Sequence, residues 1–272
     1  MIFDTHAHYD DARFDGDRGE LLRQLPERGV GCVLNCGASL ASSAAGRELA
    51  ARYPHVFFAA GVHPDEAAQP EALGETEALA RLRFLLADPK AAAVGEIGLD
   101  RHGEYPDKTS GALQEKWFRL QLRLARGLKK PVIVHSREAA ADTLRILREE
   151  GGPEIRAVLH CFSYEKEMAR RFLDLGYYLG VGGVVTYKNG RKLKEVVQYM
   201  PADRLLLETD CPYLAPEPFR GRRNWSLYLR YVVAEIAALR QISAEEVEAV
   251  TLENAQRFFG IRAPGAPSGE IV

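Results

Sequence analysis

Eight short apolar segments recur along the chain, and their number is what most constrains the fold. Between them lie stretches with the spacing of amphipathic helices, as in residues 113–128, where leucine and tryptophan recur at intervals of three and four. Eight strand–helix units in 272 residues favour a closed parallel barrel over an open doubly wound sheet. The sequence therefore predicts an α/β fold, a (β/α)8 TIM barrel, with strands within residues 1–8, 30–37, 56–63, 91–100, 131–136, 157–163, 177–186 and 205–210.

One domain accounts for this pattern. We expect residues 1–260 to form a single barrel domain, with two helices near 226–240 and 243–259 after the last strand. Residues 261–272 contain several prolines and glycines and are predicted to form a frayed tail without chemistry of its own.

Charge and cysteine content narrow the functional classes. The 36 basic and 38 acidic residues leave a formal charge of −2, which disfavours a protein that coats DNA nonspecifically. Four cysteines without a C-x-x-C pair do not suggest a disulfide framework, and no apolar run approaches the roughly 18 residues of a membrane span. We therefore expect a cytoplasmic protein without signal peptide or membrane anchor. We interpret all four cysteines as core residues: Cys32, Cys36, Cys161 and Cys211.

Polar residues gather at the predicted strand ends, as five histidines and three carboxylates show: His6, His8, His63, His135, His160, Glu96, Glu208 and Asp210. The carboxyl ends of barrel strands share one rim, where barrel enzymes carry their active sites. A single such histidine is more simply explained as a hydrogen-bonded core residue. Several buried imidazoles in one place cannot all find separate hydrogen-bond partners, and an imidazole buried without one costs free energy. The group therefore predicts a binuclear site for divalent ions such as Zn²⁺, Mn²⁺ or Mg²⁺. Asp4 shares the inner face of the first strand, either to orient a ligand histidine or for a structural hydrogen bond.

The same residues carry a resemblance that spans nearly the whole chain. The sequence resembles the TatD-type metal-dependent deoxyribonucleases of the amidohydrolase superfamily through these motifs: DTHAH (4–8), GVHP (61–64), GEIGLD (95–100), PVIVHSR (131–137), LHCFS (159–163), LLETDCPYLAP (206–216) and RGRRN (220–224). The resemblance implies that one metal ion is held by His6, His8 and Asp210. It implies that His135 and His160 hold the second ion and that Glu96 bridges the two.

Three segments depart from the family pattern. Tyr164 follows HCFS where the family usually has glycine, and RHGEYPDK at 101–108 replaces a tyrosine-rich stretch. Trp225 and Ser226 stand after RN, where proline is expected. None of these is a proposed ligand, so they bear on substrate preference and loop shape more than on the reaction.

The expected reaction is a phosphodiester hydrolysis in which the two ions activate a shared water and clamp the phosphate oxygens. Asp210 is the expected proton acceptor, and Glu208 is expected to support it or to act as an alternative base. Phosphate oxygens are expected to meet donors near the rim: His63, Arg137, Arg220, Arg222 and Asn224. For Arg222 and its neighbour Arg223, a solvated charge run is the competing explanation.

Aromatic residues just beyond the strand ends are candidates for stacking on unpaired bases: Tyr9, Phe162, Tyr164, Tyr187, Tyr213 and Trp225. Core packing is the alternative for some of these rings. Because no basic face is evident and the site is expected to lie deep in the rim, a duplex would not reach the metal ions easily. The resemblance then implies a 3′-5′ exonuclease acting on single-stranded or frayed DNA, with RNA as an alternative, in DNA repair or degradation. We expect it to act as a monomer and away from membranes.

Two other functions fit the same residues. A small-molecule amidohydrolase or phosphotriesterase would use the same binuclear site, because fold and ligands do not fix the substrate. A catalytically silent metal-binding protein would also retain the barrel. The paired acids Glu208 and Asp210 favour chemistry over storage, because storage needs no base beside a metal ion.

Overall fold

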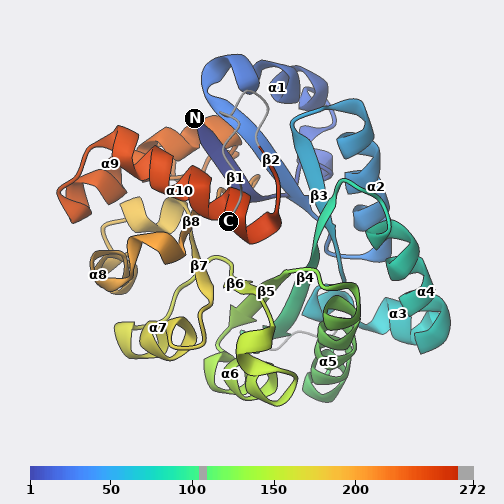
Figure 1. Cartoon of the computed structure of the whole chain (residues 1–272). Helices are drawn as coiled ribbons and strands as arrows, with labels where there is room; N and C mark the ends of the chain where they lie inside the picture. Colours follow the sequence, from blue (N-terminus) through green and yellow to red (C-terminus); the bar gives the residue numbers. More distant parts are fainter. Residues whose placement is uncertain (104–108, 263–272) are drawn as a thin grey trace.

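The computed structural model describes residues 1–103 and 109–262. Its centre is a ring of eight parallel strands, each paired with the next in chain order, and most of the helices surround this ring (Figure 1). The predicted TIM barrel is therefore confirmed. The strands are β1 Ile2–Ala7, β2 Val30–Cys36, β3 Val56–Ala60, β4 Ala91–Asp100, β5 Val132–Arg137, β6 Ala157–Leu159, β7 Tyr178–Val181 and β8 Leu205–Leu207.

The last three strands are shorter than the sequence pattern predicts. After β7, the segment Gly183–Thr186 forms a 3-10 helix. After β6 and β8, Cys161 and Asp210 have positive φ angles of 46° and 55°, which a continuing strand does not allow. The chain therefore leaves the sheet earlier than expected, and the polar residues that follow lie on rim loops.

The barrel closes between β1 and the segment that follows β8. The Asp210 N–H donates to the His6 carbonyl at 2.9 Å, and the His8 N–H donates to the Cys211 carbonyl at 2.8 Å. A single parallel bridge pairs Ala7 with Cys211. These bonds fix the backbone of two predicted metal-binding segments beside each other, although the segments are some 200 residues apart in the chain.

The helices carry their apolar faces toward the sheet. They are α1 Arg18–Gln24, α2 Leu40–Arg52, α3 Ala68–Leu73, α4 Glu75–Leu86, α5 Gly111–Leu128, α6 Ala140–Glu149, α7 Lys166–Leu173, α8 Arg191–Tyr199, α9 Leu229–Arg240 and α10 Ala244–Phe259. The Ser110 hydroxyl caps α5, and Trp117, Phe118 and Leu122 bury its apolar stripe. The helix predicted near 226–240 begins with a 3-10 turn and continues as α9.

Helix α10 covers the amino-terminal end of the barrel. The ring centroids of Phe259 and Phe3 are 5.7 Å apart, and the Met1 amino group forms an ion pair with Glu248 of the same helix. Phe258, Phe259 and Ala255 belong to one apolar cluster with a residue from each strand: Phe3, Leu34, Ala59, Ala93, Ile133, Val158, Tyr178 and Leu206. Packed side chains thus fill this end, and the functional site is left to the carboxyl end.

Two predicted segments extend beyond the described residues. Most of the 101–108 loop and residues 263–272 of the predicted tail lie outside them, and the domain boundary at residue 260 stays a prediction. Among the helices of the described part, none is both long enough and apolar enough to cross a bilayer.

Candidate metal centre

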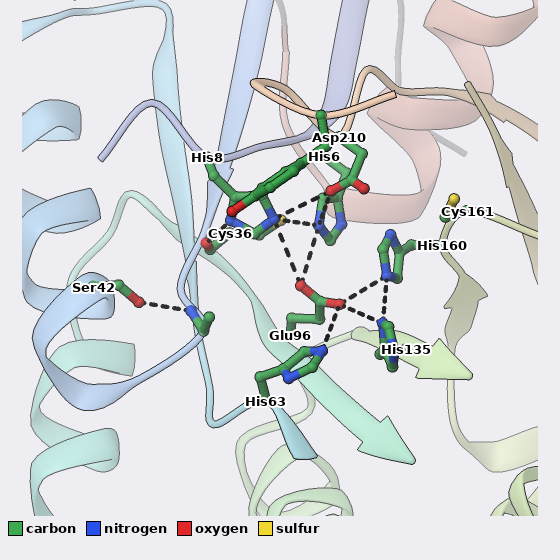
Figure 2. A network of polar contacts seen from close by, with 12 residues as sticks. His6, His8, Cys36, Ser42, His63, Glu96, His135, His160, Cys161 and Asp210 are labelled. Carbon is green, nitrogen blue, oxygen red and sulfur yellow. Dashed lines mark hydrogen bonds and ion pairs between the residues drawn. The ribbon is translucent and has the colours of Figure 1, made fainter. Parts of the chain in front are cut away.

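Glu96, on β4, is the centre of a polar cluster at the carboxyl end of the barrel (Figure 2). The residue is 3% exposed. Its Oε2 atom lies 3.3 Å from Nε2 of His6 and 3.7 Å from Nε2 of His8. Its Oε1 atom lies 2.9 Å from Nδ1 of His135 and 2.7 Å from Nε2 of His160. Each carboxylate oxygen therefore faces one pair of imidazoles.

Asp210 adds a second carboxylate on one side of this cluster only. Its Oδ1 atom lies 3.3 Å from Nε2 of His8 and 3.7 Å from Nε2 of His6. Those two imidazole nitrogens are themselves 3.1 Å apart. The structure thus brings together all six predicted ligands and places Asp210 beside His6 and His8.

Asp4 holds the loop that carries Asp210. Its carboxylate accepts hydrogen bonds from the Thr209 N–H at 3.0 Å, from the Thr209 hydroxyl at 2.7 Å and from the Ser226 hydroxyl at 2.7 Å. Burial raises the pKa of Asp4 to about 6. Asp4 contacts no imidazole ring through a hydrogen bond that the structure shows, so of the two roles left open by the sequence the structural one is favoured.

Hydrogen bonds on the outer side of two imidazoles fix which nitrogen faces the cluster. Nδ1 of His8 lies 2.9 Å from the Cys36 carbonyl, and Nε2 of His135 lies 3.0 Å from Oδ2 of Asp100. Both oxygens accept hydrogen bonds, so in a neutral imidazole these nitrogens carry the proton. His8 and His135 therefore each present a lone pair to the carboxylate oxygens of the cluster, an arrangement that a cation between them would stabilise.

The same carboxylates attract protons. Burial disfavours a charged His8, but Asp210 and Glu96 outweigh it and raise the pKa of His8 to about 9. Burial likewise opposes the charge on His135, and Asp100 and Glu96 raise its pKa to about 9. Protons and a metal ion would compete for the same lone pairs, so the donor set would bind a divalent ion more strongly as the pH rises toward about 9.

His63 presents the opposite tautomer. The Asp65 N–H donates to Nδ1 of His63 at 3.2 Å, so a neutral His63 carries its proton on Nε2. Burial lowers the pKa of His63 to about 4, which keeps the ring neutral at pH 7. Its Nε2 lies 3.7 Å from Oε1 of Glu96. His63 thus points an N–H donor into the site, whereas His8 and His135 point lone pairs.

Three sets of donor atoms lie close enough to hold an ion, with all atoms of a set within 4.8 Å of one another: His6, His8 and Glu96; His6, His160 and Glu208; His63, Glu96 and His135. These sets differ from the predicted grouping, because His63 joins His135 and Glu208 joins His160. The tautomer of His63 argues for a hydrogen-bond donor there rather than a metal ligand.

Glu208 lies behind His160. The residue is 1% exposed, its carboxylate accepts a hydrogen bond from the Cys161 N–H, and Oε1 lies 3.9 Å from Nδ1 of His160. It does not line the open cleft. This position suits support of His160 and not direct contact with a substrate, so the predicted alternative of a base acting in the cleft is not favoured.

We expect Glu208 to make the stability of the metal-free protein depend on pH. Burial raises its pKa from 4.5 to about 8. The folded state therefore binds this proton more tightly than the unfolded chain, and the resulting stabilisation is complete below pH 4.5 and is lost as the pH rises through about 8. The loss is expected to be on the order of a few kcal/mol.

Urea unfolding of chelator-treated protein at several pH values measures this effect. Glu208→Gln removes the titrating group, so its free energy of unfolding should fall less with rising pH than that of the wild type. Glu20→Gln, at an exposed position on α1, is the matched control and should behave like the wild type. Equal pH dependence in wild type and Glu208→Gln would contradict the assignment.

The cluster opens into a cleft of about 370 Å³. Four of its histidines, Glu96 and Asp210 form the floor and walls. Further lining residues are Ala38, Tyr213 and four acids: Asp10, Asp11, Asp65 and Glu66. Among the described residues that line the cleft there is no Lys or Arg, so a phosphate in it would depend on bound cations for electrostatic attraction.

The residues predicted to donate hydrogen bonds to phosphate lie in different environments. Asn224 is fully buried, its amide donates to the Thr209 carbonyl at 2.9 Å and its Oδ1 accepts from the Trp225 N–H, so its predicted contact with substrate is not favoured. It instead fixes the loop beside Asp210. The guanidinium of Arg220 lies over the Tyr187 ring at 4.3 Å.

The other predicted arginines lie on the surface. Arg137 and Arg222 are exposed, and neither they nor Arg220 lines the cleft. Arg223 is exposed and donates to Asp17 at 2.9 Å, so it forms a surface ion pair. A role of Arg137, Arg220 and Arg222 in binding substrate stays a prediction.

Most of the predicted stacking rings are not accessible. Tyr9, Phe162 and Tyr187 are buried, and the prediction that they stack on bases is wrong because they pack inside the rim loops. The Tyr164 hydroxyl bonds Ser136 at 2.9 Å and accepts from the Ala139 N–H. Trp225 is half-buried, and the sixth ring, Tyr213, is exposed.

Two contacts of the site were not predicted from the sequence. Asp100 orients His135, and its place in GEIGLD offered a signal, because residues 96 and 100 fall on the same face of a strand. The Cys36 carbonyl is a backbone group, which no residue type could indicate. Cys32, Cys36 and Cys211 are buried as predicted, but Cys161 is half-buried on a rim loop, so its core assignment is wrong.

Comparison with known proteins identifies close relatives. The sequence profile of the TatD related DNases matches residues 3–260. The chain is 40% identical over 261 residues to the uncharacterized metal-dependent hydrolase YabD of Bacillus subtilis, covering 96% of this chain and 100% of that protein. It is 37% identical over 263 residues to the 3′-5′ ssDNA/RNA exonuclease TatD of Cronobacter turicensis. This match covers 95% of this chain and 97% of that protein. The crystal structure of YJJV, a TatD homolog from Escherichia coli, superposes with a TM-score of 0.86 at 32% identity, covering 96% of this chain and 98% of that chain.

Proposed function

The chain belongs to the TatD related DNases and is a metal-dependent hydrolase, and from this premise we propose that it is a 3′-5′ exonuclease acting on the ends of single-stranded or frayed DNA. The observation that carries the proposal is the Glu96 carboxylate, each oxygen of which faces one imidazole pair in an open cleft. The name of the Cronobacter relative supports a nucleic-acid substrate, with RNA as an alternative to DNA. We further propose a monomer that acts in the cytoplasm, in DNA repair or degradation.

The proposed ligands divide into two groups around Glu96. His6, His8 and Asp210 would hold one divalent ion, and His135 and His160 would hold the other. Imidazole and carboxylate donors suit Zn²⁺, Mn²⁺ or Mg²⁺. Two such ions would supply Lewis acidity toward a phosphate oxygen and a more acidic water.

The protein groups around the cleft orient the substrate and move protons. Asp210 keeps Oδ1 toward His8 and His6, and we assign its Oδ2 atom to take the proton from the attacking water. The His63 N–H on Nε2 donates to an oxygen of the scissile phosphate. Asp100 and the Cys36 carbonyl keep His135 and His8 in the tautomers that the site requires.

The cleft favours a strand end over a duplex. Its volume of about 370 Å³ suits one nucleotide rather than a paired helix, and the described residues that line it include four acids and no Lys or Arg that could hold a second strand. For an unpaired end, the free-energy cost of unstacking the terminal base so that it can enter such a cleft is small.

Cleavage of end-labelled oligonucleotides tests the proposal. Purified protein with Mg²⁺, Mn²⁺ or Zn²⁺ should convert a 5′-labelled single strand into a ladder of shorter products and should release the label of a 3′-labelled strand as a mononucleotide. EDTA should abolish both. Intact oligonucleotides under every ion would contradict the proposal, and turnover of a lactone or phosphotriester by the same sample would then favour the small-molecule hydrolase.

A further inference from the structure

Tyr213 is the exposed aromatic side chain of the cleft. It follows Asp210 by three positions, lines the cleft, and is 46% exposed. Its ring centroid lies 6.4 Å from that of His8, with the planes at 78°. An exposed tyrosine by itself is ordinary protein surface, so the argument depends on how this ring is held.

Three contacts fix the ring at the cleft mouth. The Tyr213 N–H donates to the Asp210 carbonyl at 2.9 Å, and the hydroxyl donates to Oδ2 of Asp11 at 3.2 Å. The guanidinium carbon of Arg13 lies 4.0 Å from the ring centroid. Arg13 in turn donates to both carboxylate oxygens of Asp11, each at 3.1 Å.

Arg13 lies over one face of the ring, so a flat ligand would stack on the opposite face, for which these contacts preorganise the ring. A ring that is already ordered by Arg13 and Asp11 loses little conformational freedom when another ring stacks on it. Aromatic side chains stack on any nucleobase, because every base has a π-face. In a duplex both faces of a base are covered by neighbouring pairs, so only an unpaired or terminal base can use such a surface.

We propose that Tyr213, ordered by Arg13 and Asp11, is the surface on which the 3′-terminal base of the substrate stacks while its phosphate enters the metal cleft. The inference rests on the proposed function and adds a feature that favours strand ends over internal, stacked bases. Of the six rings near the strand ends, Tyr213 is the one that combines exposure with a place in the cleft lining.

Two substitutions separate stacking from the rest of the side chain. Tyr213→Phe keeps the ring and loses the hydroxyl, and should change KM by less than about threefold. Tyr213→Leu removes the ring, and should raise KM for single-stranded DNA by about tenfold with kcat nearly unchanged. Tyr199→Leu is the matched control, because Tyr199 is also an exposed tyrosine, 39% accessible, with a cation, Lys166, 4.4 Å from its ring centroid, but it lies on α8 outside the cleft lining.

Two substrates make the test specific for the base. On an oligonucleotide whose 3′-terminal sugar lacks a base, wild type and Tyr213→Leu should have equal KM values. A strand that ends in 2-aminopurine behind an uncleavable terminal linkage reports stacking directly, because its fluorescence should be quenched by wild type and Tyr213→Phe but not by Tyr213→Leu. Equal KM values of the Phe and Leu variants, or a Leu defect that persists without the base, would overturn the inference.

The fluorescence measurement also separates this inference from the proposed function. Protein that leaves every oligonucleotide intact but quenches 2-aminopurine through the Tyr213 ring would contradict the exonuclease and support the stacking surface. Protein that shortens DNA without any dependence on the ring would do the reverse.

Discussion

Glu96→Gln is expected to abolish the binding of one or both metal ions and to lower the rate of hydrolysis by about a thousandfold or more. Loss of a residue that only supports a metal ligand commonly lowers metal affinity or activity by about 10- to 100-fold, and Glu96 is itself a proposed ligand. In the wild type, each carboxylate oxygen faces one imidazole pair. A glutamine offers one neutral oxygen and one NH₂ group, which cannot bind a cation. One imidazole pair therefore loses its shared anionic partner.

Metal analysis of the purified variant, together with kcat at saturating metal, measures both effects. Glu27→Gln, at an exposed position near the start of β2, is a charge-matched control that should keep the metal content and activity of the wild type. A Glu96→Gln protein with the full metal content and normal turnover would remove Glu96 from the centre of the site.

Asp210→Asn is expected to lower kcat by about a thousandfold, because proton transfer by a positioned base contributes 10²- to 10⁴-fold. Asparagine is the substitution of choice because Asp210 has a φ angle of 55°, and asparagine tolerates the left-handed region better than most residues. The loop should therefore keep its shape, and the amide should still reach the His8 side of the cluster.

The metal content of Asp210→Asn decides between catalysis and storage. We expect the ion beside His135 and His160 to be retained, because Asp210 faces only His6 and His8. Wild-type turnover that disappears in this folded, metal-loaded variant excludes a catalytically silent metal-binding protein. Identical turnover in both proteins would show that Asp210 takes no part in proton transfer.

The barrel and its ligand cluster were predictable because both follow from alternation along strands. His6 lies in β1, His8 directly follows that strand, and residue 96 lies inside β4, so their meeting at one rim follows once eight strands close into a ring. Sheet pairing, rather than any local preference, sets their distances.

The prediction was less accurate where regular structure ends. A strand that continued to residue 210, as the sequence predicts, would place Glu208 and Asp210 on one face. In the structure β8 stops at Leu207 and the positive φ of Asp210 breaks the alternation, so Glu208 lies behind His160 while Asp210 faces the cleft. Asn224 lies in a loop with no periodicity to indicate burial. Likewise, the tautomer of His63 depends on one backbone N–H, which sequence patterns do not reveal.

Helix α10 closes the amino-terminal end of the barrel with packed apolar side chains, so the cleft is open only at the carboxyl end. A polynucleotide could not thread through it, so a nucleotide released by the proposed exonuclease would have to leave by the opening through which it entered. We therefore expect it to work distributively, removing few nucleotides in each encounter and shortening a whole population of strands in step.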